Sequence, residues 1–391
     1  MTVIATSLAS GAATSAAATV AADLKKKLGT AHPALVVIMA STAQPLDVVT
    51  GAMTQSFPGS AVVGTSTAGE FTEQGDAKSS IAAWALAGDY KVFTGMGRNL
   101  RLDAEKSVGA ALEGLPREMH GYPHCTALLL LDPLAGNGEE ATLAAASLLG
   151  PNVPLAGGAA GDDLRMKETF LACGQASASN AVVVALLFSK SQLGLGVCHG
   201  HSPLSGPLRV TKAKGNTVYE IEGRPAWGVW LDETRTHAQA RGVDVSTLRK
   251  EDEGAYLLRY EAGLATGDAF KIRAPLSRDS DGAISFACGI AEGAVFRITE
   301  STPENQVKSA REAARRARAQ LAGKASGALV FDCICRNLIL GDKFSAAVRG
   351  MSEELGGVPL AGFETYGEIA LAAGDMSGFH NTTSVVLAFP E

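Results

Sequence analysis

One structural pattern occurs three times in this chain of 391 residues: an apolar strand, a loop, a helix-like run, a second short apolar strand, and a glycine turn closed by an acidic residue. The copies span residues 36–70, 128–163 and 329–368. A further apolar strand follows each turn, at residues 82–86, 182–187 and 384–389. Strands that alternate with helices at this spacing predict an α/β fold of layered sheets. The copies are further apart than the roughly 20–50 residues of a solenoid repeat, so we expect repeated strand–helix–strand–glycine-turn–strand modules in two fused halves.

The glycine turns predict where a ligand would bind. Only glycine lets a backbone approach a ligand without a clash, and such turns at strand ends often hold ligands. We therefore expect Gly64, Gly157 and Gly362 to contribute to a binding site. The acids that close the turns are open to two interpretations, as caps that hold backbone N–H groups or as polar groups that line a pocket. These acids are Glu70, Asp162, Asp163 and Glu368.

Length and composition exclude several classes of protein. The chain is long enough for two domains with real cores, and a proline-rich break at residues 201–207 predicts the boundary between them. The net charge of −6 argues against general binding of nucleic acid. Six cysteines are too few for a disulfide scaffold and suit a reducing compartment. No run approaches the roughly 18 apolar residues of a membrane span, so we predict a cytoplasmic protein without membrane insertion.

The second half of the chain carries three clear local signals. Gly215-Asn216 lies between two apolar runs and predicts a hairpin turn. Pro225 predicts the start of a helix that carries Trp227 and Trp230 on one face. Residues 303–321 predict a second helix, with an acid in the first turn, arginines late in the helix and a glycine after it.

The run Gly136-Asn137-Gly138-Glu139-Glu140-Ala141 resembles the glycine loop of a dinucleotide site. Two glutamates occupy the place where a phosphate would bind, which favours an ordinary loop and helix start. Both interpretations stay open on the sequence.

The cysteines and histidines allow a metal site or a nucleophile. Cys198-His199-Gly200-His201 offers three possible ligands, which a zinc site could complete with Cys333 and Cys335 if the segments met. The alternative is buried thiols beside a polar linker. Cys335 also precedes Arg336, and a neighbouring guanidinium lowers the pKa of a thiol. Because no catalytic base is identifiable, we expect no enzyme activity and keep an enzyme that uses Cys335 as an alternative.

Several stretches resemble one known family. Residues 64–70 and 155–163 resemble the FIST N-terminal domain. Four further stretches resemble the FIST C-terminal domain: residues 215–226, 335–336, 362–369 and 380–382. We therefore predict a FIST N-terminal domain over residues 1–205 and a FIST C-terminal domain over residues 206–391.

The resemblance implies a sensory protein of bacterial signal transduction that binds a small molecule. The polar contacts that we predict for its ligand are Arg336, Tyr366, Glu368 and His380. A structural interaction protein is a further alternative.

Some stand-alone FIST proteins are haem proteins that sense nitric oxide and regulate a partner histidine kinase. The resemblance therefore also implies non-covalent haem as a possible cofactor, which needs an axial ligand. His199 and His201 are the axial candidates because ligand sites often form at domain junctions. The sequence leaves the ligand, the signalling partner and the oligomeric state undetermined.

Overall fold

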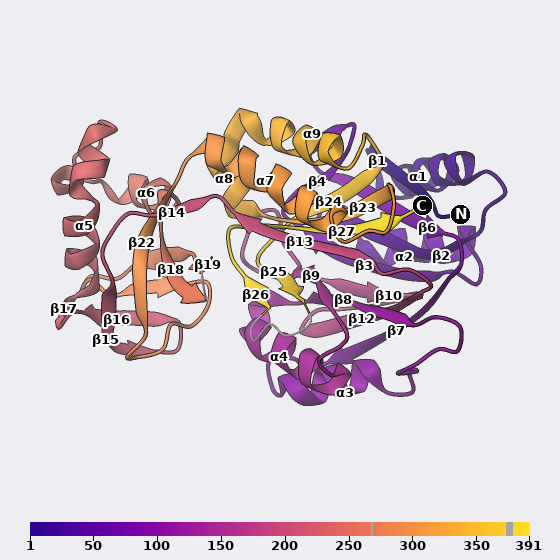
Figure 1. Cartoon of the computed structure of the whole chain (residues 1–391), viewed down its shortest axis with the longest axis horizontal. Coiled ribbons are helices and arrows are strands. Elements are labelled where there is room, and N and C mark those ends of the chain that lie inside the picture. The colour runs from indigo at the N-terminus through magenta and orange to yellow at the C-terminus, as the bar shows by residue number, and fades with distance from the viewer. Residues whose placement is uncertain (267–268, 373–377) are drawn as a thin grey trace.

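The computed structural model describes residues 1–266, 269–372 and 378–391. Figure 1 shows a larger part that contains both chain ends and a smaller part to its left. The larger part is built from the three repeats. The smaller part, residues 201–301, is an insert within the third repeat. The predicted α/β fold of layered sheets in two halves is confirmed.

The first two repeats follow each other along the chain. The first contains β1 (Val3–Ser10), α1 (Ala13–Leu28), β2 (Pro33–Ser41), α2 (Leu46–Ser56), β3 (Ala61–Thr67), β4 (Glu70–Thr72), β5 (Gly75–Ala77) and β6 (Ser80–Ala87). The second contains β7 (Tyr90–Arg98), α3 (Ala104–Leu112), β8 (His124–Leu131), α4 (Gly138–Leu149), β9 (Leu155–Ala159), β10 (Leu171–Cys173), β11 (Ala176–Ala178) and β12 (Ala181–Ser189).

The third repeat has the same order, with the insert between its first strand and first helix. It contains β13 (Gly194–His199), α7 (Pro303–Arg318), β23 (Ala325–Cys333), α8 (Ile334–Leu340), α9 (Phe344–Glu354), β24 (Leu360–Thr365), β25 (Glu368–Leu371), β26 (Phe379–His380) and β27 (Thr383–Pro390). In each repeat the second and third long strands are parallel, as in β2 with β3, β8 with β9 and β23 with β24. A helical crossover joins each parallel pair, as such a pair requires.

Each repeat gives its short hairpin to the sheet of another repeat. Hairpin β4–β5 extends the third sheet at β24, β10–β11 extends the first sheet at β3, and β25–β26 extends the second sheet at β9. Three six-stranded sheets result, each completed by strands from elsewhere in the chain. This exchange is cyclic, because every repeat both gives and receives a hairpin.

Backbone hydrogen bonds fix the three crossing points. The Ala68 N–H donates to the Glu364 carbonyl at 3.1 Å, and the Gly161 N–H donates to the Ser66 carbonyl at 2.9 Å. At the third crossing, the Tyr366 N–H donates to the Ala159 carbonyl at 3.2 Å. The glycine turns therefore hold the repeats to one another.

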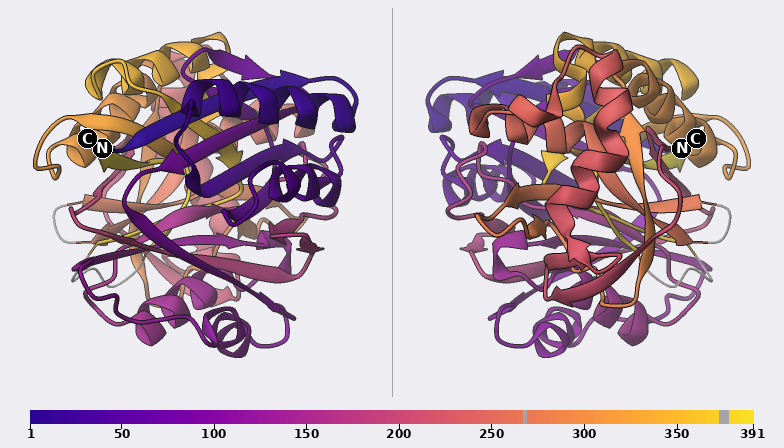
Figure 2. Two further views of the ribbon diagram at one scale, coloured as in Figure 1. Left: turned by 90° about the vertical axis from the view of Figure 1, so that its right-hand side faces the viewer. Right: turned by 90° about the vertical axis from the view of Figure 1, so that its left-hand side faces the viewer.

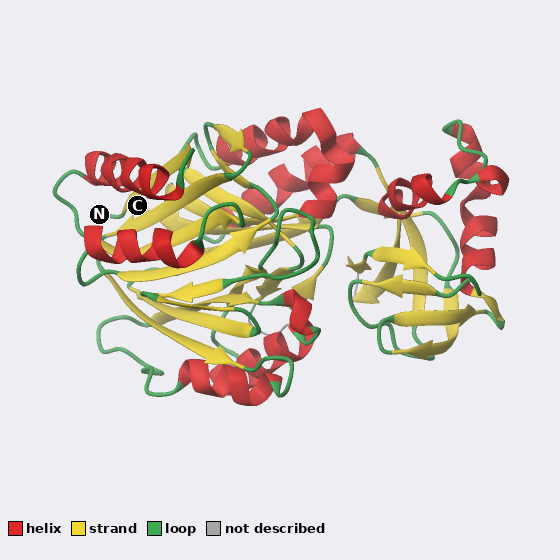
Figure 3. Ribbon diagram, turned by 180° about the vertical axis from the view of Figure 1, so that it is seen from behind, coloured by secondary structure: helices red, strands yellow, loops and turns green. Residues whose placement is uncertain are grey.

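The inner faces of the three sheets meet in one central core. Its buried members include Val37, Trp84, Leu130, Phe331 and Phe363. Helices cover the outer face of each sheet: α1 and α2 on the first, α3 and α4 on the second, and α7 to α9 on the third. Figure 2 (left) shows these three groups of helices around the strands, and Figure 3 shows them from behind.

The insert forms a sheet with its own core. Its elements are β14 (His201–Pro203), β15 (Leu208–Lys214), β16 (Thr217–Ile221), β17 (Arg224–Pro225), α5 (Ala226–Ala240), α6 (Glu253–Arg259), β18 (Tyr260–Thr266), β19 (Ala269–Arg273), β20 (Pro275–Arg278), β21 (Ile284–Phe286) and β22 (Val295–Ser301). Trp230 is fully buried and packs on Phe286 and Phe296, with ring centroids 5.9 and 6.0 Å apart. The chain enters the insert through β14 and leaves through β22, and these two strands pair.

Most of the local signals agree with the structure. The hairpin at Gly215-Asn216 joins β15 to β16, and the predicted helices are α5 and α7. The three strands expected after the glycine turns are β6, β12 and β27. The boundary predicted at residue 205 lies between β14 and β15, inside the insert. No helix in the described part of the chain has the length and apolar character that crossing a bilayer requires.

We predict that Gly161→Ala destabilises the fold at the crossing from the second repeat to the first. A Cβ at this position would lie 2.7 Å from the Thr67 carbonyl carbon and closer still to the Ala68 nitrogen, both of which are backbone atoms. The expected loss is about 1–3 kcal/mol in the free energy of unfolding, measured with urea. Gly109→Ala in α3 is the matched control, because a Cβ there meets nothing within 4 Å; this change should raise stability by about 0.5–1 kcal/mol. Equal stabilities of the two variants would contradict the prediction.

Candidate functional site

A cavity of about 870 Å³ lies where the insert meets the second and third repeats. Ligand sites in proteins commonly have volumes of about 300–1,000 Å³ and form at such junctions. Four groups of residues line the cavity. Those from the second repeat are Pro133, Leu134, Gly136, Gly138, Glu139, Glu140, Leu164 and Met166; those from the insert are Gly215, Asn216, Gly254, Leu258, Ala274, Pro275, Leu276 and 286–289; those from α8 and the strand before it are Cys333, Ile334, Cys335 and Leu338; those from the last hairpin are Tyr366, Phe379 and Asn381.

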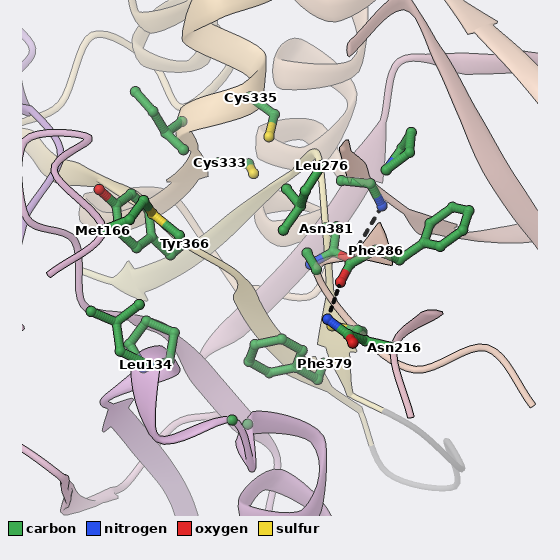
Figure 4. A pocket seen from close by; sticks show the side chains of 18 of the residues that line it. Leu134, Met166, Asn216, Leu276, Phe286, Cys333, Cys335, Tyr366, Phe379 and Asn381 are labelled. Carbon is green, nitrogen blue, oxygen red and sulfur yellow. Dashed lines mark hydrogen bonds between the residues drawn. The ribbon is translucent and has the colours of Figure 1, made fainter. Parts of the chain in front are cut away.

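The rim of the cavity exposes apolar side chains. Leu164, Met166, Leu276 and Leu338 are 49%, 54%, 49% and 48% exposed, and all four line the cavity. Apolar side chains that gather around a concave site, with polar groups among them, mark a surface that binds something. Figure 4 shows several of the lining side chains directed toward a common space.

Tyr366 fixes the loop that carries two of these rim residues. Its hydroxyl donates to the Asp162 carboxylate at 2.6 Å and accepts from the Leu164 N–H at 2.9 Å. Burial and the Asp162 carboxylate raise the pKa of Tyr366, so the hydroxyl keeps its proton. Asp163, Leu164 and Met166 have positive φ angles of 55°, 61° and 52°. Such angles are uncommon outside glycine, and backbone strain of this kind gathers at functional sites.

Phe379 forms part of the cavity wall because two glycines leave it room. A Cβ on Gly138 would lie 2.9 Å from the Phe379 ring, and a Cβ on Gly367 would also clash with it. Gly138 belongs to the loop that resembles a dinucleotide site. The helix that starts there carries Glu139, whose carboxylate binds Lys271 and Arg273 at 2.8 Å each. The first turn of the helix therefore carries a carboxylate with two cationic partners from the insert, which fits the ordinary-loop interpretation.

The acids that close the glycine turns are held by the turns themselves. The Thr67 hydroxyl donates to Glu70, and the Thr365 hydroxyl donates to Glu368. Asp162 accepts from the Met166, Lys167 and Glu168 N–H groups at 2.8, 2.6 and 3.1 Å. Glu70 and Glu368 are buried, and neither lines the cavity. These contacts fit the interpretation of the acids as caps.

Arg336 lies away from the cavity, in the core between α8 and α7. Its guanidinium binds Asp332 at 2.9 Å, the Ser309 hydroxyl at 2.8 Å and the Gln306 side chain and carbonyl. The residue is fully buried. Its position suits a structural ion pair, because its charged group faces protein partners and not the cavity.

Most of the other predicted ligand residues also lie apart from the cavity. Gly64, Gly157 and Gly362 are inside β3, β9 and β24, packed against neighbouring chain. The His380 Nε2 faces the Ala370 carbonyl at 3.0 Å, which ties β26 to β25. Of the predicted set, the cavity contains Tyr366 and the alternative nucleophile Cys335. Sequence reasoning missed Leu276, Phe379 and the other apolar wall residues, because single apolar residues look like core.

His199 and His201 lie beside a separate, shallow hollow of about 230 Å³. His201 is buried, with Nδ1 3.1 Å from the Thr299 hydroxyl and Nε2 3.6 Å from a Glu261 carboxyl oxygen. Burial raises the pKa of Glu261 to about 8 and holds the pKa of His201 well below its ordinary value. Burial therefore favours the uncharged form of both groups, a protonated carboxyl beside a neutral imidazole.

These histidines do not fit haem. The hollow is smaller than ordinary ligand pockets, and the His201 ring is enclosed between Thr299 and Glu261. None of the described residues that line the large cavity is a histidine. The described residues also contain no group of three or more His, Cys, Asp or Glu side chains placed to hold a metal ion.

We predict that the protein loses stability as the pH rises from 6.5 to 8.5. Burial raises the pKa of Glu70 to about 7, and those of Glu261 and Glu364 to about 8, each from 4.5. A carboxyl whose pKa is higher in the folded state stabilises the fold fully below its unfolded pKa, and this stabilisation is lost as the pH rises through the folded pKa. Urea unfolding across this range should show the decline. Glu261→Gln should reduce the decline without abolishing it, because the amide cannot ionise whereas Glu70 and Glu364 still can. An unchanged slope would contradict the assignment.

We also predict that Arg336→Ala destabilises the protein strongly. The change leaves the Asp332 carboxylate buried without its cation, which costs about 3–5 kcal/mol in comparable cases. The control is Arg315→Ala, which removes an exposed pair with Glu312 and should cost less than about 1 kcal/mol. Urea unfolding compares the free energies of unfolding of the two variants. Similar losses would show that the buried ion pair contributes no more to stability than the exposed pair.

Two family models and several curated proteins match this chain. A model of the FIST N domain matches residues 34–224, and a model of the FIST C domain matches residues 243–371. An uncharacterized protein of Mycobacterium bovis is 31% identical over 196 residues, which cover 49% of each chain. One of Mycobacterium tuberculosis has the same identity over 49% of this chain and 50% of its own.

An uncharacterized protein of Methanocaldococcus jannaschii is 28% identical over 163 residues, which cover 40% of this chain and 31% of that protein. The chain thus spans half or less of the length of these curated relatives. The two domain matches together extend over most of the sequence and cover most of the first repeat, all of the second repeat, most of the insert and most of the third repeat. The chain therefore carries a FIST N domain followed by a FIST C domain.

Proposed function

We propose that this protein is a sensor that binds a small, largely apolar molecule in the cavity between the insert and the repeats. The observation that carries the proposal is the cavity itself, with its volume of about 870 Å³ and its apolar rim. FIST domains are associated with sensing in signal transduction, which is consistent with a binding role. The few polar groups among the walls, such as Tyr366, Asn216 and Asn381, would orient the ligand.

The position of the cavity supports a signalling role. A ligand there would touch the insert, the second repeat and the third repeat at once. The insert joins the repeats through β14 and β22, which lie side by side. Contacts made across such a junction favour one placement of the two parts over others, and that difference in affinity is what lets a ligand shift a conformation. We propose that a signalling protein in the cytoplasm, of which a histidine kinase is one type, reads this placement.

We propose a binding role and not catalysis. The alternative nucleophile Cys335 lines the cavity, but no histidine is among the described lining residues to act as its base. A thiol nucleophile is usually activated by such a base or by a cationic neighbour, and the guanidinium of Arg336 is directed toward Asp332 and α7.

Haem-based sensing of nitric oxide remains a prediction from the family resemblance. The two axial candidates lie outside the cavity and do not fit haem, as described above. A visible absorption spectrum with and without haemin addresses it directly, since stoichiometric uptake with a strong Soret band would be needed to support it.

The binding site can be tested with the neutral fluorescent probe N-phenyl-1-naphthylamine. The parent protein should bind it saturably at one site. Leu338→Glu, on α8 in the cavity wall, should weaken the Kd at least tenfold, because a carboxylate in an apolar wall loses hydration when the probe binds. Leu276→Glu, in the part of the wall that the insert supplies, should also weaken binding of the probe.

Leu143→Glu is the matched control for this test. Leu143 lies on α4, is 44% exposed and is absent from the cavity lining, whereas Leu338 is 48% exposed on α8. The control should bind the probe as the parent does. Equal binding by all four proteins would exclude the cavity as the binding site.

A further inference from the structure

Three of the six cysteines converge on the cavity. Cys288 reaches it from the insert, and Cys333 and Cys335 reach it from the third repeat. All six cysteines are free thiols. Cys125, Cys173 and Cys198 lie elsewhere in the fold and do not line the cavity.

Cys333 and Cys335 are placed as a pair. Cys333 ends β23 and is the residue before α8, and Cys335 is in the first turn of that helix. Figure 4 shows both side chains on the same wall, with their sulfur atoms directed to the cavity. Two residues apart, the chain separates Cα atoms by at most about 7 Å, and the start of a helix brings them closer. A disulfide needs a Cα separation of about 4.4–6.8 Å, and two residues at this spacing can meet that requirement.

The two thiols differ in accessibility. Cys333 is 3% exposed, whereas Cys335 is only partly buried. Burial, together with the neighbouring Cys335 side chain, raises the pKa of Cys333 well above the ordinary value. A molecule that enters the cavity therefore meets Cys335 first, with Cys333 behind it.

We propose that Cys333 and Cys335 form a redox-active dithiol in the cavity wall, which a small organic disulfide oxidises reversibly. In the first step the Cys335 thiol loses its proton, and its sulfur attacks one sulfur of the small disulfide. That S–S bond breaks, and the departing thiolate takes up a proton. In the second step the Cys333 thiol loses its proton, and its sulfur attacks the Cys335 sulfur of the mixed disulfide. The mixed S–S bond breaks as the Cys333–Cys335 bond forms, and the second small thiolate leaves and takes up a proton. Two protein thiols are oxidised and one small disulfide is reduced to two thiols.

This site does not depend on the ligand of the proposed sensor. It needs only that the cavity admits a small disulfide. The Cys333–Cys335 disulfide would alter the cavity wall, because α8 begins directly after Cys333. The same helix carries Ile334 and Leu338, which also line the cavity. The bond would therefore form within the wall that a ligand contacts.

The test uses the full chain and 2-hydroxyethyl disulfide, which is small and neutral. After exposure, the protein is denatured, remaining thiols are blocked with N-ethylmaleimide, and tryptic peptides are weighed. Trypsin releases residues 325–336 as one peptide that contains both cysteines and no other. We expect this peptide to lose two hydrogens and take up no N-ethylmaleimide, at least tenfold faster than the Cys173 thiol is lost, and dithiothreitol to reverse the change.

Two variants separate the roles of the thiols. Cys333→Ser should stop at a mixed disulfide on Cys335, and Cys335→Ser should react at least tenfold more slowly than the parent. In urea the small disulfide should lose its preference for the Cys333–Cys335 pair over Cys173, because the folded structure creates that preference. The proposal is overturned if residues 325–336 stay doubly alkylated or carry two mixed adducts. A cross-link from Cys288 to either cysteine, or parent-like reaction of Cys335→Ser, would overturn it as well.

Discussion

The cyclic exchange of hairpins is the constraint on which the rest of the structure depends. Each sheet presents an edge strand, β3, β9 or β24, that is completed by a hairpin from another repeat. An open edge exposes unpaired N–H and C=O groups, so no repeat could satisfy its own sheet alone. The three sheets can then pack their inner faces into one shared core. The repeats are therefore parts of one cooperative unit and not independent domains.

The cavity follows from this exchange. The turn of the third repeat crosses onto the second sheet, which brings Phe379 against the start of α4 and Tyr366 against Asp162. The insert branches from the third repeat between β13 and α7, and residues of the insert line the other side of the cavity. Residues from the middle, the insert and the end of the chain thus share one space. A molecule bound there would contact the second repeat, the insert and the third repeat where they meet.

Buried polar groups hold the crossings together at the cost of pH sensitivity. Thr67 and Thr365 each donate to the acid three residues later, so Glu70 and Glu368 stay in the turns without an ion pair. Burial favours their neutral forms, because a charge loses hydration in the core. Arg336 and Asp332 are different, since each charge has the other as its partner. The same fold therefore uses protonated carboxyls at the crossings and a true ion pair beside α8.

The sequence by itself determined the central part of each repeat, from its first parallel strand to the strand after the glycine turn, and the hairpin at Gly215-Asn216. These features depend on the spacing of apolar residues and on turn residues that lie close together in the chain. Interactions between neighbouring residues are enough to predict them. The exchange of hairpins could not be read in this way, because the choice of sheet edge depends on contacts between distant repeats. For the same reason Gly64 and Gly362, expected beside a ligand, lie inside strands where close packing requires a small residue.

Only the tertiary structure decided which polar residues face the cavity. Tyr366 was expected there and lines it, whereas Arg336 was expected there and lies in the core. Both are plausible ligand contacts as residue types, and their spacing in the chain does not distinguish them. The first turn of α8 directs Cys335 toward the insert and Arg336 toward α7, because successive residues on a helix point about 100° apart. Where segments distant in the sequence meet, their packing decides which side chains face the cavity. Neighbouring residues in the chain do not determine that packing.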